Sequence, residues 1–169
     1  SDVCSSDLLN GQQLADLATQ VPPDWLEVTL HQYMPLFHME HCVFCAFLSE
    51  GTDYTNCGRP CEHHTVKLRD RVGVEHILQA DAGCRNTVFN GTAQSGAEWL
   101  PQFQTLGLRH FRVEFLQESP AQVQQILQLY DRLLQGEMSG SQLWKKLRQS
   151  TGSIQQQLGV TRGTLKEGL

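Results

Sequence analysis

The hydrophobic pattern of the first part of the chain predicts one helix followed by one strand. Apolar residues recur at helical spacing within residues 11–20, and a Pro-Pro pair at positions 22–23 ends that pattern. Residues 25–34 (WLEVTLHQYM) alternate between apolar and polar side chains and are rich in strand formers. We therefore expect a short helix that leads into a strand.

The middle of the chain reads as short strands and helices with brief connections. Residues 65–69 and 76–80 are strand candidates joined by a polar turn. Residues 95–106 have the pattern of a helix, and residues 109–116 (RHFRVEFL) alternate as a strand. Helices that alternate with strands are typical of a parallel α/β fold.

The clearest element is a helix that begins after Ser119. This serine suits the N-cap, Pro120 suits the first helical position, and Gly136 suits the residue that ends the helix. Its apolar side chains recur on one face, which predicts that this face packs on a core. The face consists of Val123, Ile126, Leu127, Tyr130, Leu133 and Leu134.

The fold class that we expect is α/β, as the C-terminal half of a TIM-like barrel. A complete eight-stranded barrel needs roughly 200 to 250 residues, and this chain has 169. We assign residues 9–136 to the barrel, with residues 38–64 as a long cysteine-rich loop. The polar residues 1–8 read as a leader that is not native, and residues 137–169 as a linker or the start of a following region.

The barrel prediction makes the segment 109–116 a central parallel strand. Both faces of such a strand are covered, so Phe111, Val113 and Phe115 should be buried on one of them. Arg112 and Glu114 would then lie at the strand end or in the barrel interior.

Charge and hydropathy limit the choice of partners and compartment. Lys and Arg total 13 against 18 acidic residues, so the formal charge is -5 and no global basic field indicates a nucleic-acid partner. Apolar runs are far shorter than the roughly 18 to 20 residues of a membrane span. Residues 1–8 lack the basic and apolar regions of a secretory signal. We expect a cytoplasmic protein without a membrane segment.

The cysteines carry the strongest chemical signal. A C-x2-C pair is followed by a C-x3-C pair after eleven intervening residues, and glycine and proline inside this stretch allow tight turns. Paired cysteines of this kind hold zinc or an iron–sulfur cluster, and four thiolates alone do not decide between them. Reduced thiols also fit a chain without an export signal. The candidate ligands, four of which would bind, are Cys42, Cys45, Cys57, Cys61 and Cys84.

Polar residues near the cysteines are candidates for supporting roles. His41 precedes the first pair and His63 follows the second, so either could donate a hydrogen bond to a metal-binding sulfur. Arg71 and Arg85 lie beside predicted strand ends and could grip an anionic substrate. A cysteine protease would need one thiolate paired with a base. Nothing in the sequence singles out such a cysteine, and the catalytic residues stay unassigned.

The runs MPLFHMEHCVFCAFLSEGTDYTNCGRPCEHH and DRVGVEHILQADAGCRNTVFN resemble the collagenase-like peptidase family of unassigned catalytic type. The likeness is greatest to its long bacterial and plant-plastid-like members and covers about residues 25–135. It implies a barrel-like catalytic domain with a [4Fe–4S] cluster. Some relatives hydroxylate transfer RNA, ribosomal RNA or a quinone precursor without oxygen, with prephenate implicated for RNA; others were named as collagen-degrading proteases.

The resemblance also suggests roles for individual cysteines. Cys57 and Cys61 match the family's C-x3-C, Cys42 or Cys45 would supply a preceding ligand, and Cys84 lies where some relatives have their last cysteine. The close C-x2-C departs from the smaller relatives, so the four ligands stay open. We expect part of an iron–sulfur RNA hydroxylation enzyme of bacterial cytoplasm or plastid stroma, inactive alone. The alternatives are a collagenase-like protease and a zinc-stabilised interaction module.

Overall fold

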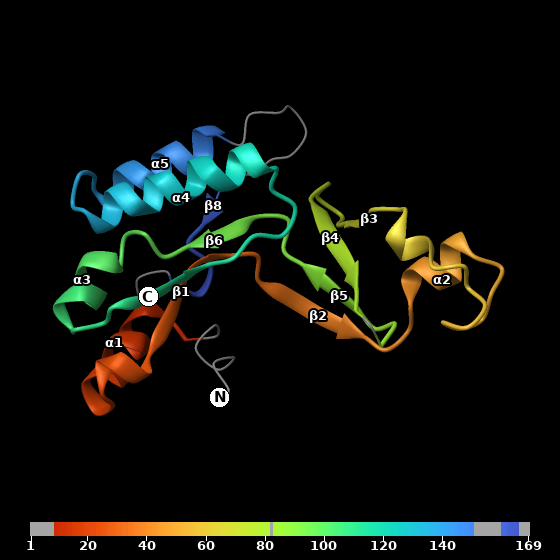
Figure 1. Cartoon of the computed structure of the whole chain (residues 1–169), viewed down its shortest axis with the longest axis horizontal. Helices are drawn as coiled ribbons and strands as arrows, with labels where there is room; N and C mark the ends of the chain where they lie inside the picture. Colours follow the sequence, from red (N-terminus) through yellow and green to blue (C-terminus); the bar gives the residue numbers. More distant parts are fainter. Residues whose placement is uncertain (1–8, 82, 151–159, 166–169) are drawn as a thin grey trace. The chain divides into compact units, whose positions relative to one another are not determined.

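The computed structural model describes residues 9–81, 83–150 and 160–165, which form a mixed α/β structure (Figure 1). These residues divide into two compact units. Unit 1 contains the described residues up to Tyr33 and from Thr92 onward, and unit 2 contains those from Met34 to Gly91. Each unit has its own sheet and its own apolar core.

Unit 1 is built on a four-stranded mixed sheet. Its strand order is β7-β1-β6-β8, with β1 parallel to β7 and antiparallel to β6, and with β6 parallel to β8. Parallel strands need a long connection, and all of unit 2, the strand β6 and the helix α3 lie between β1 and β7 along the chain. The strands are β1 (Glu27–Gln32), β6 (Ala93–Ser95), β7 (His110–Val113) and β8 (Val160–Thr161).

Helices contribute most of the apolar surface in unit 1. Asn10 and Gln13 form a capping box at the start of α1, and Ser119 and Gln122 form one at the start of α4. The helices α4 and α5 lie side by side as an antiparallel pair with a short connection (Figure 1). The helical segments are α1 (Gly11–Gln20), η2 (Pro23–Trp25), α3 (Leu100–Thr105), α4 (Pro120–Leu134), α5 (Gly140–Ser150) and η4 (Gly163–Leu165).

The core of unit 1 joins these elements. Leu30 of β1, Phe103 of α3 and Leu143 of α5 are fully buried in one cluster, together with Leu129 and Leu133 of α4. Burial of each such side chain stabilises the fold by roughly 1.5–3 kcal/mol. The helices therefore hold to the sheet through this shared core.

Unit 2 is a four-stranded antiparallel sheet in the order β2-β5-β4-β3. Its small core consists of Phe44 from the helix α2, Leu78 from β4 and Val88 from β5. This packing fixes α2 to the sheet. The elements are β2 (Pro35–Met39), α2 (Val43–Leu48), η3 (Pro60–Glu62), β3 (Val66–Arg69), β4 (Glu75–Ala80) and β5 (Asn86–Phe89).

Several predicted elements agree with the structure. The helix 11–20 is α1, the strand candidates at 65–69 and 76–80 are β3 and β4, and the helix after Ser119 is α4. In α4 the buried side chains are Leu129, Tyr130 and Leu133, whereas Leu127 and Leu134 are exposed. The face of α4 that is buried therefore includes Leu129, which was not predicted, and leaves out Leu127 and Leu134.

Two segment predictions were wrong. The helix expected at 95–106 begins only at Leu100, and residues 93–95 form the strand β6, in which Gln94 and Ser95 pair with β1. The linker expected at 137–169 contains α5, whose Leu143 and Leu147 are buried in the core of unit 1. The face of α5 that carries these two leucines packs in the core of unit 1, so residues 140–150 belong to that unit. The expected leader at 1–8 lies outside the described residues.

The barrel prediction is only partly met. β7 runs parallel to β1, but it is an edge strand and not a central one, and Phe111 and Val113 are half-buried. Arg112 is exposed and pairs with Glu27. Among residues 9–81, 83–150 and 160–165 the two sheets stay open and form no closed barrel. In the same residues no helix is long and apolar enough to cross a membrane.

Candidate metal centre

The topology of unit 2 brings its cysteines to one end of the sheet. Met39 at the end of β2 and Ala80 at the end of β4 both pair with Asn86, the first residue of β5. β3 begins at Val66, opposite Leu78 near the end of β4. The loops 40–65 and 81–85 therefore both leave this end of the sheet. Cys84 meets the two cysteine pairs for this reason, although it follows them by more than twenty residues.

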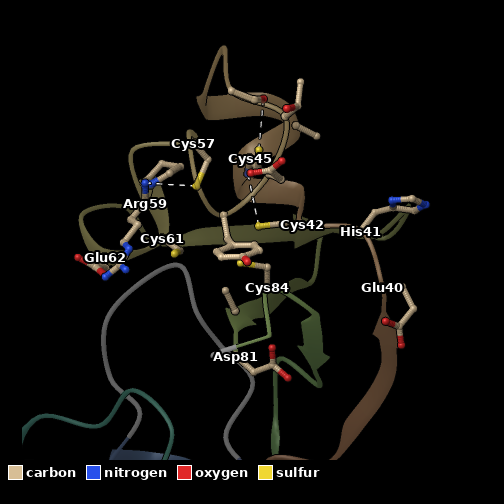
Figure 2. Close-up of a pocket in the computed structure, with 17 residues that line it drawn as sticks. Glu40, His41, Cys42, Cys45, Cys57, Arg59, Cys61, Glu62, Asp81 and Cys84 are labelled. Carbon is tan, nitrogen blue, oxygen red and sulfur yellow. Dashed lines mark hydrogen bonds and ion pairs between the residues drawn. The ribbon is translucent and has the colours of Figure 1, made fainter.

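The five thiols line one cavity of about 720 Å³ (Figure 2). They come from the N-terminal end and first turn of α2, from η3 and the loop that leads into it, and from the turn before β5. All five cysteines are free thiols. The cysteines that line the cavity are Cys42, Cys45, Cys57, Cys61 and Cys84.

Cys42 is the N-cap of α2, and its sulfur receives two N–H groups. The backbone N–H of Cys45 donates to Cys42 Sγ at 3.5 Å, and the side-chain Nδ2 of Asn86 donates to the same sulfur at 3.8 Å. Asn86 also accepts from the backbone N–H of Val43 through Oδ1, at 2.6 Å. Hydrogen bonds of this kind orient a thiolate ligand and tune a bound metal.

The segment between Cys57 and Cys61 makes a tight turn. Gly58 and Arg59 both have left-handed backbone conformations, with φ of 68° and 52°, and Pro60 starts the short helix η3. This turn brings the N–H of Arg59 within 3.4 Å of Cys57 Sγ. A left-handed non-glycine residue is uncommon and marks a place where the surroundings hold the backbone.

Cys45 differs from the other cysteines in its environment. It is buried, and its thiol donates to the backbone carbonyl of Gly51 at 3.4 Å. Burial raises the pKa of the Cys45 thiol, and the neighbouring Cys57 and Cys42 raise it further. The Cys45 sulfur thus faces a carbonyl oxygen, whereas the sulfurs of Cys42 and Cys57 face N–H groups.

Cys84 lies in a turn organised by Asp81. The Asp81 carboxylate accepts from the backbone N–H groups of Gly83 and Arg85, and Cys84 has a left-handed backbone with φ of 60°. Burial raises the pKa of the Cys84 thiol, followed in effect by the charges of Cys42, Cys57 and Cys61. Cys84 thus interacts with three other thiols that line the same cavity (Figure 2).

The predicted supporting residues are not all near the thiols. His41 lies at the rim of the cavity, exposed, and its ring points away from the sulfur atoms (Figure 2). His63 is exposed and outside the cavity lining. Arg85 forms an ion pair with Asp81 and does not line the cavity. Arg71 lies in the turn before β4, and the cavity lies beyond the other end of this six-residue strand, a length of about 17 Å.

Asn86 is the residue whose role the sequence did not predict. It is fully buried at 0% exposure and contacts both Cys42 and the first residue of α2. Its only sequence signal is its place directly after G-C-R, at the start of a strand. A buried asparagine is uncommon enough to deserve a hydrogen-bonding explanation.

A second group of buried polar side chains lies in unit 1. Ser95 Oγ and Tyr130 Oη are 2.8 Å apart, and Tyr130 also reaches the carbonyl of Leu30 and Nδ1 of His31. His31 is 2% exposed, and its Nε2 has no hydrogen-bond partner among the described residues. Burial lowers the pKa of His31 to about 4. The imidazole is therefore neutral at physiological pH.

The donor set at the cavity suits a thiophilic metal centre. In the described part of the chain, no three His, Cys, Asp or Glu side chains are arranged to hold one metal ion. The thiols instead surround a shared space, with N–H donors directed at Cys42 and Cys57. No family model, curated protein or solved structure matches this chain.

Proposed function

We propose that unit 2 binds a [4Fe–4S] cluster in the cavity at the end of its sheet. The observation that carries this proposal is the convergence of five free thiols, from three separate segments, on one cavity of about 720 Å³. A chain that only needed small buried residues would have no reason to gather its cysteines in this way. Thiolates are the usual protein ligands of such clusters.

We assign the four ligands to Cys42, Cys57, Cys61 and Cys84. The sulfurs of Cys42 and Cys57 accept backbone N–H groups, as ligating thiolates do. Cys84 lines the same cavity as the other three members of this set. Cys45 is the remaining thiol. Its proton is donated to the Gly51 carbonyl, which leaves it the least suited of the five to bind metal.

The size of the cavity favours a cluster over a single zinc ion. A structural zinc site is a closed tetrahedron of four ligands, with each sulfur about 2.3 Å from the metal, and it keeps no open position. A volume of about 720 Å³ lies in the range of small-molecule sites. It has room for a cluster and for a substrate group beside it. Zinc stays the alternative cofactor, and with it a non-enzymatic interaction module.

We further propose that the chain is part of a collagenase-like peptidase family protein that hydroxylates transfer or ribosomal RNA without oxygen, with a cosubstrate such as prephenate. The support is the resemblance around the cysteines, and the bound cluster would supply the redox chemistry. The parallel pair of β1 and β7 would belong to a TIM-like barrel, and the antiparallel strand β6 departs from that fold. Free thiols suit a reducing compartment such as bacterial cytoplasm or plastid stroma.

The protease alternative has less support at this site. A catalytic cysteine needs a lowered pKa and a neighbouring base. The pKa values of Cys45 and Cys84 are instead raised by burial. His41, the histidine that lines the cavity, points away from the thiols (Figure 2). Neither cysteine is therefore activated as a nucleophile.

The cofactor is tested by purifying the chain without oxygen, supplying iron and sulfide, and measuring bound metals and visible absorption. We expect a brown protein with broad absorption in the blue region and iron and sulfide in equal amounts. A colourless protein that holds one zinc ion per chain would overturn the cluster and support the interaction module.

The RNA activity is tested separately on the complete protein. Cells that lack it should lose one hydroxylated nucleoside, detected by mass spectrometry of digested transfer and ribosomal RNA. Restoring the complete protein should restore that nucleoside, and a variant with Cys57→Ala should not. An unchanged set of RNA nucleosides, with loss of a peptidase activity instead, would favour the protease.

A further inference from the structure

We propose that Asn86 is a positioning residue that holds the Cys42 thiolate and tunes the electronic state of the bound metal centre. The inference rests on the proposed function, because it assumes that Cys42 is a ligand. It goes beyond the ligand set, since it assigns a role to a side chain that itself contacts no metal.

The position of Asn86 in the sheet is rigid. As the first residue of β5 it pairs with Met39 on one side and with Ala80 on the other, so strands flank it on both sides. Its side chain is fully buried. A side chain with these restraints has little freedom, and the atoms at its tip are accurately placed.

The amide of Asn86 makes two different hydrogen bonds. Oδ1 accepts from the Val43 N–H at 2.6 Å, and Nδ2 donates to Cys42 Sγ at 3.8 Å. Asparagine can do both because its amide carries an acceptor and a donor. Aspartate would lose the donor when ionised, and leucine would lose both groups. Neither substitute reproduces the pair.

These bonds connect the strand to the metal-binding loop. The bond to Val43 fixes the start of α2, and the bond to Cys42 fixes the sulfur that precedes it. An N–H group that points at a ligating sulfur withdraws electron density from it, which favours the reduced form of a cluster. Loss of this donor should therefore make the reduction potential more negative.

Two substitutions separate hydrogen bonding from packing. Asn86→Ala removes the amide and leaves a cavity, and Asn86→Leu removes the amide while filling the space. If the hydrogen bonds matter, both cluster-loaded variants shift the reduction potential to more negative values, by similar amounts. Both variants should also lose iron to a chelator at about 10- to 100-fold lower chelator concentration, as is typical when a side chain that hydrogen-bonds a metal ligand is removed.

The matched control is Thr87→Val on the same strand. Thr87 bonds to His38 at 2.8 Å and does not line the cavity, so this variant should keep the wild-type potential and iron retention. A purely structural role for Asn86 would lower the unfolding temperature of the variants without moving the potential. If the wild-type chain binds the cluster and the variants give that result, this inference alone is overturned. A wild-type chain that takes up no iron overturns the proposed function as well.

Discussion

The cysteines of unit 2 differ in what their sulfur atoms face, and this difference predicts different responses to substitution. Cys57 accepts an N–H group and borders the cavity, whereas the Cys45 thiol donates to the Gly51 carbonyl. We expect Cys57→Ala and Cys61→Ala to lose the metal centre, because a site of four thiolates rarely tolerates the loss of one. Cys45→Ala should retain it. Iron and zinc content of the purified variants measures this.

Each outcome in the cysteine series has a clear meaning. Full metal retention in Cys57→Ala or Cys61→Ala would contradict the ligand assignment. Loss of metal in Cys45→Ala, with retention in Cys84→Ala, would show that Cys45 is the fourth ligand and that Cys84 is not. The Cys45 variant also loses a buried side chain, so its unfolding temperature is measured beside its metal content.

The sequence predicted the thiols of the site better than their surroundings. The C-x2-C and C-x3-C spacings are local, so they indicate a metal site without knowledge of the fold. The contact between Asn86 and Cys42 joins residues 44 positions apart. It depends on the pairing of β5 with β2 and β4, which a linear pattern does not reveal. The distance of Arg71 from the cavity has the same origin.

At the scale of elements, the loop between α2 and Cys57 depends on a glycine. A Cβ atom at Gly51 would lie 2.5 Å from the carbonyl oxygen of Asn56 and 2.6 Å from the Cα atom of Cys57. Both are backbone atoms, so the loop itself would have to move. Gly51→Ala should therefore displace Cys57 and weaken cluster binding, measured by iron loss to a chelator.

The control for this loop is Gly73→Asn. Gly73 also lies in a turn of unit 2, with φ of 94°, but a Cβ there would meet open space. Asparagine tolerates positive φ better than other side chains, so the fold should persist. Iron retention equal to wild type in both variants would show that the approach of Gly51 to Cys57 is unimportant.

Elements with complete local signals were predicted well, and those that depend on partners were not. The helix α4 has its N-cap, proline and apolar face in sequence, so Ser119 marked its start correctly. The strands β5 and β6 are only four and three residues long, too short for a periodic pattern. The helix α5 is Gln- and Ser-rich, and burial of Leu143 reveals its place in the core.

At the scale of the whole molecule, the two units differ in the residues that a spectroscopic measurement can follow. The thiols that line the cavity all lie in unit 2, whereas Trp25, Trp99 and Trp144 lie in unit 1. Unit 1 also has the larger apolar core. Tryptophan fluorescence therefore reports on the folding of unit 1, while visible absorption would report on the metal centre of unit 2.

The stability of unit 1 should fall below neutral pH because of His31. Its pKa is lowered by burial from 6.5 to about 4, so the unfolded chain binds more protons between these values. The free energy of unfolding therefore rises with pH through this window and falls as the pH drops from 6.5 toward 4. Between pH 8 and pH 5 we expect a loss of about 2 kcal/mol from this group.

This pH dependence is measured by urea unfolding followed through tryptophan fluorescence. The His31→Gln variant has no titratable group at position 31. Its free energy of unfolding should therefore change by about 2 kcal/mol less than that of the wild type between pH 8 and pH 5. Equal pH dependence in the two proteins would contradict the buried, neutral state of His31.

The central claim is that the five-thiol cavity of unit 2 holds one [4Fe–4S] cluster through four of its cysteines. Native mass spectrometry of the chain, purified and sprayed without oxygen, tests this claim most directly. We expect one dominant species with the mass of the chain plus one cluster, and one bound cluster for Cys45→Ala as well. A chain found only with a single zinc ion, or with no metal after iron and sulfide are supplied, would contradict it.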